Sequence, residues 1–355
     1  MERIKMLDIK ATITGIRYKY SMCRKLNEYS AGQIQSGMPN DATFYLNIDG
    51  EKVALSYWVS PKRTRSYPYA RVYDSLNFSG KKITVIPVMK DEGVNGDRDY
   101  IQWDTVSLMS LLGVYVIIGY YKDASVSRRF ENKITDQVFD MEYVLDGILD
   151  ILSYQSDALH WNLTQIDRLQ EVGNKAINSY QRIFQNFGQG MHSIDRARLR
   201  INQVMNEKER FMNFSRDRAK EAQNRESQII QQGESIVPGE KSTITIKNYL
   251  GGEYYLTADE AKIGRDCIYL IEAKNTVRGG LPATSDIKDG LIKMVLFSNL
   301  TKVTVNNVEY QKKAVLKLTG NESTLTPNEI STINLLKREA SDNGFHILLN
   351  DEYIA

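Results

Sequence analysis

The spacing of hydrophobic and polar residues changes along this chain, and each change predicts a different kind of secondary structure. Up to about Phe130, short β-branched runs alternate with turn residues. Residues 42–59 predict a hairpin with an Asp-Gly turn, and Lys81–Val88 and Val114–Tyr121 predict two buried strands. Asp104–Leu112, between these two strands, has helical spacing, so the strands are expected to be parallel. This region is therefore predicted to be α/β.

Strand patterns almost disappear between residues 135 and 233, and helical spacing replaces them. The apolar residues that predict two amphipathic helices are Leu145, Ile148, Leu149 and Leu152 in the first and Ile183, Phe184 and Phe187 in the second. The second helix should end near Gly188. Ile194–Gln232 predicts a long, highly charged helix. A helix this polar either bridges solvent or contacts a polar partner.

Alternation with period two returns after the Pro238-Gly239 turn. The strands predicted there are Thr243–Ile246, Tyr254–Ile263, Ile268–Ala273, Lys302–Val305 and Phe345–Leu349. One helix is predicted at Asp286–Asn299. A second begins at the Thr-Pro-Asn-Glu capping box at Thr326 and ends at Asn343-Gly344. The fold class is expected to be mixed α+β, with domains at 1–134, 135–235 and 240–355.

Composition narrows the class of protein. The chain has 355 residues, enough for two or three domains. Its longest apolar run, Leu108–Tyr121, is interrupted by glycines, and the N-terminus has no signal-peptide core, so a cytoplasmic protein without a membrane span is expected. The unpaired Cys23 and Cys267 exclude a zinc ribbon or a disulfide scaffold. The net charge of +2 means that a nucleic-acid binder must gather its basic residues on one face.

The most informative segment is DEAKIGRDCIYLIEAK, which runs from Asp259 to Lys274. Its apolar strand ends in two charges, and alternation places Glu272 and Lys274 on one face, about 7 Å apart. The Gly-Arg-Asp turn at 264–266 should fold the preceding strand back and bring Asp259 close to Glu272. A salt-bridged Glu and Lys at a strand end can also be purely structural.

This grouping suits a Mg²⁺ site. Hard divalent cations take carboxylate and carbonyl oxygens, so Asp259, Glu272 and the backbone carbonyl of Ala273 are the expected ligands. The metal would activate water and neutralise charge on a phosphate, while Lys274 would orient or deprotonate the water and stabilise the transition state. Glu260 competes with Asp259 as first ligand, but strand alternation lets only one of the two face Glu272.

The segment resembles the PD-(D/E)XK nuclease superfamily, which includes most type II restriction endonucleases. The resemblance rests on the D-x₁₂-E-A-K spacing, the hairpin, Asn275 after the lysine, a Gly-rich loop at 278–280, and a following helix that carries Lys288 and Lys293. It covers roughly residues 240–305. One departure is Ala258, where the family has proline before the aspartate.

The resemblance implies a restriction-endonuclease-like core with catalytic residues Asp259, Glu272 and Lys274 and with Glu260, Lys288 and Lys293 around them. It also implies Mg²⁺-dependent hydrolysis of double-stranded DNA that leaves a 5′-phosphate. A type II restriction enzyme would act as a homodimer and would have a DNA methyltransferase as its companion. Two rivals stay open: a repair or mobile-element nuclease with structural specificity, and a DNA-binding protein without enzymatic activity.

Basic residues mark the expected DNA contacts, because lysine and arginine bind phosphates and arginine reads guanine. The expected contacts are Lys62, Arg63, Arg65 and Arg71 in a tyrosine-rich loop, Arg98 and Gln102 in the loop 90–104, and Arg196, Arg198 and Arg200 in the long helix. The loop 90–104 is rich in acidic residues and is also a weaker candidate for a second metal site. A solvated loop and an exposed, ion-paired helix are the structural alternatives.

Overall fold

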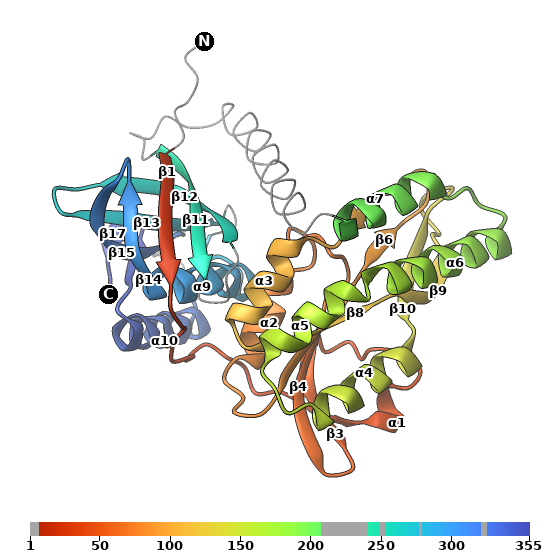
Figure 1. The fold of residues 1–355 in the computed structure, drawn as a ribbon. Coiled ribbons are helices and arrows are strands. Elements are labelled where there is room, and N and C mark those ends of the chain that lie inside the picture. Colours follow the sequence, from red (N-terminus) through yellow and green to blue (C-terminus); the bar gives the residue numbers. More distant parts are fainter. Residues whose placement is uncertain (1–6, 207–239, 249–252, 277–278, 321–324) are drawn as a thin grey trace. The chain divides into compact units, whose positions relative to one another are not determined.

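The computed structural model describes residues 7–206, 240–248, 253–276, 279–320 and 325–355. The chain forms two compact units (Figure 1). Unit 1 combines Met1–Arg24 with Arg216–Ala355, and unit 2 is Lys25–Ser215. This division differs from the three predicted segments: the N-terminal strand belongs with the C-terminal part, and the described helices of 135–235 belong with the preceding α/β region. Within the described residues, no helix is long and apolar enough to cross a membrane.

Unit 1 is built on a sheet that closes on itself. Its strands are β1 (Leu7–Ile13), β11 (Glu240–Asn248), β12 (Glu253–Ile263), β13 (Cys267–Asn275), β14 (Leu300–Val305), β15 (Val308–Thr319), β16 (His346–Leu349) and β17 (Glu352–Tyr353). The order is β13-β12-β11-β1-β14-β15, and β15 pairs again with β13, which closes a six-stranded barrel. Figure 1 shows β1 between β11 and β14. β16 and β17 extend the sheet beyond β15.

Two helices connect parallel strands of unit 1. α9 (Thr284–Asn299) follows β13 and precedes β14 and β15, and β15 runs parallel to β13. α10 (Pro327–Asn343) leads from β15 to the parallel strand β16. The buried residues of α9 include Ile287, Leu291, Met294 and Val295, as the helical spacing predicts. Thr326 and Glu329 cap α10 reciprocally, as the predicted capping box requires. The mixed α+β class is therefore confirmed.

Unit 2 contains a five-stranded sheet in the order β2-β3-β4-β5-β8. Its strands are β2 (Glu28–Ser30), β3 (Thr43–Ile48), β4 (Glu51–Tyr57), β5 (Lys82–Pro87) and β8 (Val114–Gly119). The β3–β4 hairpin turns at Asp49 and Gly50, both with positive φ, which explains the Asp-Gly pair. α2 (Pro68–Ser75) and α3 (Trp103–Leu111) connect the parallel strands β4, β5 and β8, as predicted for β5 and β8.

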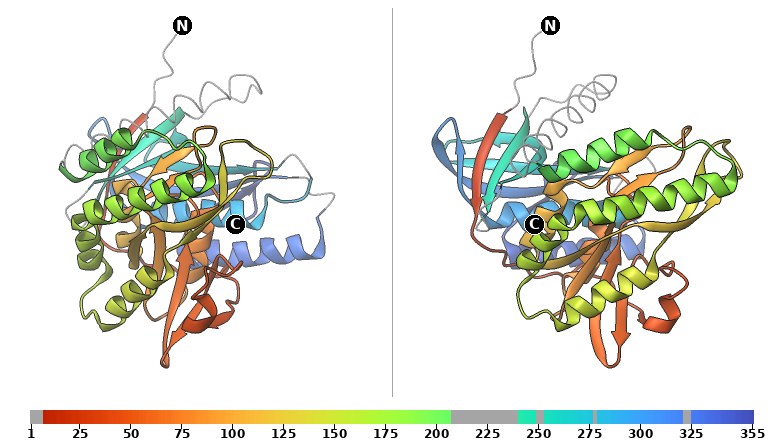
Figure 2. Two further views of the ribbon diagram at one scale, coloured as in Figure 1. Left: turned by 90° about the vertical axis from the view of Figure 1, so that its right-hand side faces the viewer. Right: turned by 45° about the vertical axis from the view of Figure 1, so that its right-hand side comes forward.

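The remaining elements of unit 2 are short hairpins and helices. They are α1 (Ala31–Ile34), β6 (Met89–Asp91), β7 (Arg98–Tyr100), β9 (Tyr121–Val126), β10 (Ile134–Phe139), α4 (Met141–Ser153), α5 (Ala158–Asp167), α6 (Leu169–Phe187) and α7 (Ile194–Asn206). Figure 2 shows α6 (green) alongside the hairpin of β9 and β10. β10 lies where strands were not expected.

The predicted apolar face of α4 is partly wrong. Met141, Val144, Ile148 and Ile151 are buried, whereas Leu149 is 48% exposed. The buried stripe follows i, i+3, i+7 and i+10 from the start of the helix, and Leu149 lies beyond its edge. α6 ends at Gly188 in the left-handed conformation, as expected. Of the predicted helix at 194–232, only α7 lies within the described residues.

α5 covers the open edge of β8 with side-chain amides. Asn162 Oδ1 accepts from the Val116 amide at 2.7 Å, and its Nδ2 donates to the Val114 carbonyl at 3.0 Å. Gln165 Oε1 accepts from the Ile118 amide at 3.4 Å. Asn162 and Gln165 are both buried. These bonds satisfy backbone groups that an uncovered edge strand would leave to pair with another chain.

We predict that Asn162→Ala destabilises the protein by roughly 3 kcal/mol, because a buried amide and a buried carbonyl of β8 lose their partners. Chemical denaturation measures this loss as a lower midpoint. Asn186→Ala is the control, since Asn186 is exposed on α6 and its replacement should cost less than about 0.5 kcal/mol. Equal losses in the two variants would contradict this role of Asn162.

Candidate active site

The hairpin of β12 and β13 positions the first carboxylate. The two strands are antiparallel, with Ile263 opposite Ile268 and Glu260 opposite Ile271. The Gly264 amide closes the turn on the Cys267 carbonyl at 2.8 Å. Because of this register, Asp259 Oδ2 reaches β13 and accepts from the Ala273 amide at 2.9 Å. Asp259 itself is exposed to solvent. The structure thus brings Asp259 next to the Glu-Ala-Lys end of β13, as the sequence predicts.

Glu272 is the buried centre of the site, with only 2% of its side chain exposed. Lys274, two residues along the same strand, places its Nζ 2.9 Å from Glu272 Oε1. Lys293, on α9, places its Nζ 2.5 Å from Glu272 Oε2. Both carboxylate oxygens therefore bind an ammonium group. Lys274 Nζ also lies 2.7 Å from Asp289 Oδ2 on α9. We call Asp259, Glu272, Lys274, Asp289 and Lys293 the carboxylate–lysine cluster.

Strand alternation separates Glu260 from this cluster. Glu260 forms an ion pair with Lys262 on its own strand at 2.8 Å, while Asp259 bonds to β13. Of the two competing acids, the structure joins Asp259 to Glu272 and not Glu260. Lys288 is buried on α9. Lys293 is the lysine of that helix that reaches Glu272, and Arg278 of the Gly-rich loop lies outside the described residues.

The two carboxylates of the cluster titrate in opposite directions. Burial raises the pKa of Glu272 above its ordinary value of 4.5; Lys293 opposes this shift, and the charge of Asp259 adds to it. Asp259 is exposed as a residue, but its carboxyl group lies against β13, where loss of hydration would raise its pKa. The charge of Lys293 and the hydrogen bond from Ala273 outweigh that effect, and its pKa falls below its ordinary value of 3.8. The cluster thus holds one readily ionised and one reluctantly ionised carboxylate.

The two lysines stay protonated. Burial would lower the pKa of Lys274, but the neighbouring charges of Glu272 and Asp289 raise it well above its ordinary value of 10.5. The pKa of Lys293 is also raised, because Glu272 and Asp259 outweigh the effect of its burial. Three carboxylates and two ammonium groups leave the cluster with one net negative charge.

The oxygen donors of the cluster are of the chemical type that a hard divalent cation takes. Asp259 and Glu272 provide carboxylate oxygens, and the Ala273 carbonyl is the oxygen that follows Glu272 along β13. The described residues contain no group of three or more His, Cys, Asp or Glu side chains that could hold a metal ion. A cation here would take the rest of its ligands from water and substrate, which is how Mg²⁺ is usually held. The net negative charge of the cluster would attract it.

Comparisons with protein-family models, with curated proteins and with solved structures found no match to this chain.

The tyrosine-rich loop of unit 2 is tied to the protein itself. Arg63 forms an ion pair with buried Asp104 at 3.1 Å. Arg65 lies among Glu92, Asp97 and Asp99, and its Nε is 3.2 Å from Asp99 Oδ2. These arginines neutralise part of the negative charge of the loop 90–104, which explains why that loop can be rich in carboxylates. The expected contact of both residues with DNA has to compete with these ion pairs.

Other predicted DNA contacts are held in different ways. Arg71 is half-buried and donates to the Tyr57 carbonyl at 2.9 Å. Arg98 donates to the Ser193 carbonyl at 2.9 Å, and Gln102 is the half-buried residue that precedes α3. Among the predicted DNA contacts, the exposed residues are Lys62 in the tyrosine-rich loop and Arg196 and Arg198 on α7. Arg200 on α7 is partly exposed.

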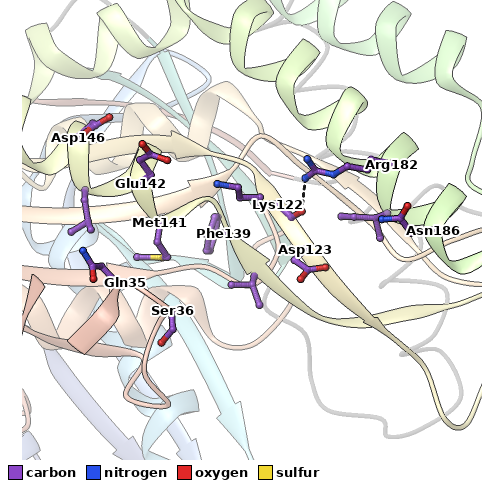
Figure 3. Close-up of a pocket in the computed structure, with 13 residues that line it drawn as sticks. Gln35, Ser36, Lys122, Asp123, Phe139, Met141, Glu142, Asp146, Arg182 and Asn186 are labelled. Atoms are coloured by element: carbon purple, nitrogen blue, oxygen red, sulfur yellow. Dashed lines mark hydrogen bonds between the residues drawn. The ribbon is translucent and has the colours of Figure 1, made fainter. Parts of the chain in front are cut away.

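A separate hollow of about 830 Å³ lies in unit 2 (Figure 3). Lys122, Asp123, Glu142 and Arg182 are among its lining residues, and Arg182 donates to the Lys122 carbonyl at 3.0 Å. None of the residues expected at the catalytic or DNA-binding site lines it. Its mixed charges do not indicate a particular ligand.

Asp289 is the member of the cluster that the sequence analysis missed. It lies four residues before Lys293 on α9, so both side chains project from the same face of the helix. That spacing was visible in the sequence. However, Asp289 belongs to no Glu-x-Lys motif, and only the packing of α9 against β13 shows that it reaches Lys274.

We predict that Glu272 titrates above 4.5 and Asp259 below 3.8 in the metal-free protein. Protonation of Glu272 therefore favours the folded state, and this contribution is lost as the pH rises through its raised pKa. Asp259 acts in the opposite sense. Its contribution to the stability of the folded state is present above the pKa of Asp259 in the unfolded chain, and it is lost as the pH falls through the lowered pKa of the folded state. Carboxyl ¹³C chemical shifts measure both midpoints, and a reversed order would contradict the electrostatics of the cluster.

Proposed function

We propose that this protein is a Mg²⁺-dependent endonuclease that hydrolyses phosphodiester bonds of double-stranded DNA at the carboxylate–lysine cluster. The observation that carries the proposal is the meeting of Asp259, Glu272 and Lys274 on two paired strands, with Lys293 reaching the same carboxylate from α9. The resemblance of Asp259–Lys274 to the PD-(D/E)XK motif supports the same chemistry.

The charges of the cluster suit phosphate hydrolysis. Asp259, Glu272 and the Ala273 carbonyl would hold the cation. A bound Mg²⁺ supplies Lewis-acid activation of a water molecule and neutralises charge on the scissile phosphate. With one cation of charge +2 the cluster changes from one net negative to one net positive charge. It then attracts the phosphate anion that it has to bind.

Lys274 has an electrostatic role in this proposal. Its raised pKa keeps the ammonium protonated at neutral pH, so it is a poor base for removing a proton from water. A protonated lysine can donate hydrogen bonds to phosphate oxygens and stabilise the negative charge that grows on them in the transition state. The alternative that Lys274 deprotonates the water is therefore disfavoured.

Within this activity, we propose a type II restriction enzyme that works as a homodimer beside a methyltransferase of the same DNA specificity. Cleavage of both strands of a duplex needs one centre for each strand, which a symmetric dimer provides. Unit 2 adds a second folded body to the catalytic unit and could read the DNA sequence. A repair or mobile-element nuclease would use the same cluster but would recognise DNA structure.

One observation favours a second, non-enzymatic role for the cluster. Both oxygens of buried Glu272 already bind ammonium groups, so the cluster is satisfied as a structural ion-pair network without a metal. The protein would then bind DNA without cutting it. Glu260, the acidic residue next to Asp259 on β12, offers a control that separates the catalytic role from the structural one.

We predict that Asp259→Ala and Glu272→Ala abolish Mg²⁺-dependent cleavage of duplex DNA, because each removes a cation ligand. Glu260→Ala should cut at nearly the wild-type rate, since Glu260 pairs with Lys262 away from the cluster. Incubation with unmethylated phage DNA and sequencing of the ends measure cleavage and specificity. DNA binding in Ca²⁺ and thermal melts show whether each variant is folded. If a folded Glu272→Ala variant cuts normally, or if the wild-type protein never cuts, the catalytic role is ruled out and the cluster has only the structural role.

We also predict that reversing the charges of Arg196, Arg198 and Arg200 weakens DNA binding and flattens its salt dependence. Each lost phosphate contact should lower the slope of log K against log salt concentration by about one. Reversal of three lysines of the same unit, Lys25, Lys122 and Lys175, is the control for net charge. An unchanged slope in the α7 variant would place the DNA elsewhere.

A further inference from the structure

Helix α9 touches Lys274 at two adjacent positions. Asp289 binds the ammonium group, with Oδ2 2.7 Å from Nζ. Gly290 lies against the aliphatic stem: a Cβ added to Gly290 would be 3.3 Å from Lys274 Cε and 3.5 Å from its Cγ. The same Cβ would be 2.8 Å from Leu316 Cδ1 on β15. The absence of a side chain at Gly290 therefore lets the lysine stem lie directly on α9, with Asp289 holding its end.

We propose that Asp289 is a positioning residue that fixes the ammonium group of Lys274 for catalysis, an inference that rests on the proposed nuclease function. Asp289 acts through Lys274: Asp289 Oδ2 accepts from the Lys274 ammonium group, whereas Asp259 accepts from the Ala273 amide. The Asp289 side chain is 24% exposed, whereas that of Glu272 is 2% exposed, so Asp289 lies at the edge of the cluster and Glu272 at its centre.

The need for such a residue follows from the competing demands on Glu272. In the metal-free protein, Glu272 Oε1 is one of two anchors of Lys274. A carboxylate that binds a divalent cation gives up much of its attraction for a neighbouring ammonium group, and the cation itself repels that group. Asp289 lies on α9, not on β13, and is not one of the proposed cation ligands, so its ion pair with Lys274 can persist. It therefore holds the lysine near the centre when Glu272 is occupied.

A lysine chain has four rotatable bonds and loses considerable conformational freedom when it is fixed. Contact with Gly290 restricts the stem, and the ion pair with Asp289 restricts the end. A group fixed in advance stabilises a transition state better than one that must be ordered during the reaction. Loss of Asp289 should therefore slow the chemical step more than it weakens DNA binding.

The test is a double-mutant cycle with Asp289→Asn, Lys274→Met and the double variant. Asparagine keeps the size of aspartate and removes its charge. Single-turnover cleavage with Mg²⁺ gives the chemical rate, and duplex affinity in Ca²⁺ gives binding separately. Thermal melts of the metal-free variants provide a readout that does not depend on activity. Asp286→Asn is the matched control, because Asp286 is a half-buried acid of the same helix without an ion pair among the described residues.

We expect Asp289→Asn to slow single-turnover cleavage by at least about tenfold with duplex affinity nearly unchanged. The double variant should cut no more slowly than Lys274→Met, and the two single variants should lower the Tm by amounts that do not add. Asp286→Asn should cut normally.

Three results would overturn the proposal. Asp289→Asn could cut at the wild-type rate. Its effect could persist in full in the Lys274→Met background, which would mean that Asp289 does not act through the lysine. Finally, a wild-type protein without any cleavage would remove both this inference and the proposed function, whereas the first two results leave the proposed function standing.

Discussion

A single buried negative charge organises the candidate site. Glu272 lies on an otherwise apolar strand with 2% of its side chain exposed, and an unpaired charge in that position would be strongly destabilising. The protein compensates it with two lysines, one from the same strand and one from α9. Each lysine is itself half-buried, with 17% of the Lys274 side chain and 13% of the Lys293 side chain exposed, and is stabilised by its carboxylate. The cluster therefore works as a unit: Glu272 shares both lysines, and removal of Glu272 leaves Lys293 without its carboxylate partner among the ion pairs of the cluster.

The architecture of unit 1 brings these charges together. The tight turn after β12 places Asp259 against β13, and the parallel pairing of β13 with β15 requires a crossover that α9 provides. That crossover brings Asp289 and Lys293 to the cluster, and the absence of a side chain at Gly290 allows close contact with Lys274. Asp259 is the exposed member of the cluster, whereas Glu272 at its centre is buried.

The sequence predicted what depends on local patterns. The Asp-Gly turn, the capping box at Thr326, the Glu-x-Lys alternation and the spacing of α9 are all short-range signals, and the structure has each of them. Long-range pairings were not predictable in this way. Nothing in β1 indicates that it pairs with β11, more than two hundred residues away, and β15 was missed although it closes the barrel. Similarly, the ion pairs of Arg63 and Arg65 depend on acids that lie about thirty to forty residues further along the chain.

We propose that Asp259 and Glu272 together hold a divalent cation. Anomalous diffraction from crystals soaked in Mn²⁺ tests this directly, because it locates the ion without relying on activity. We expect a single strong peak at about 2.1 Å from oxygens of Asp259 and Glu272, with Lys293 displaced from Glu272 and Lys274 still bound to Asp289. Saturating Mn²⁺ with no peak at this position, and with both lysines still on Glu272, would contradict it.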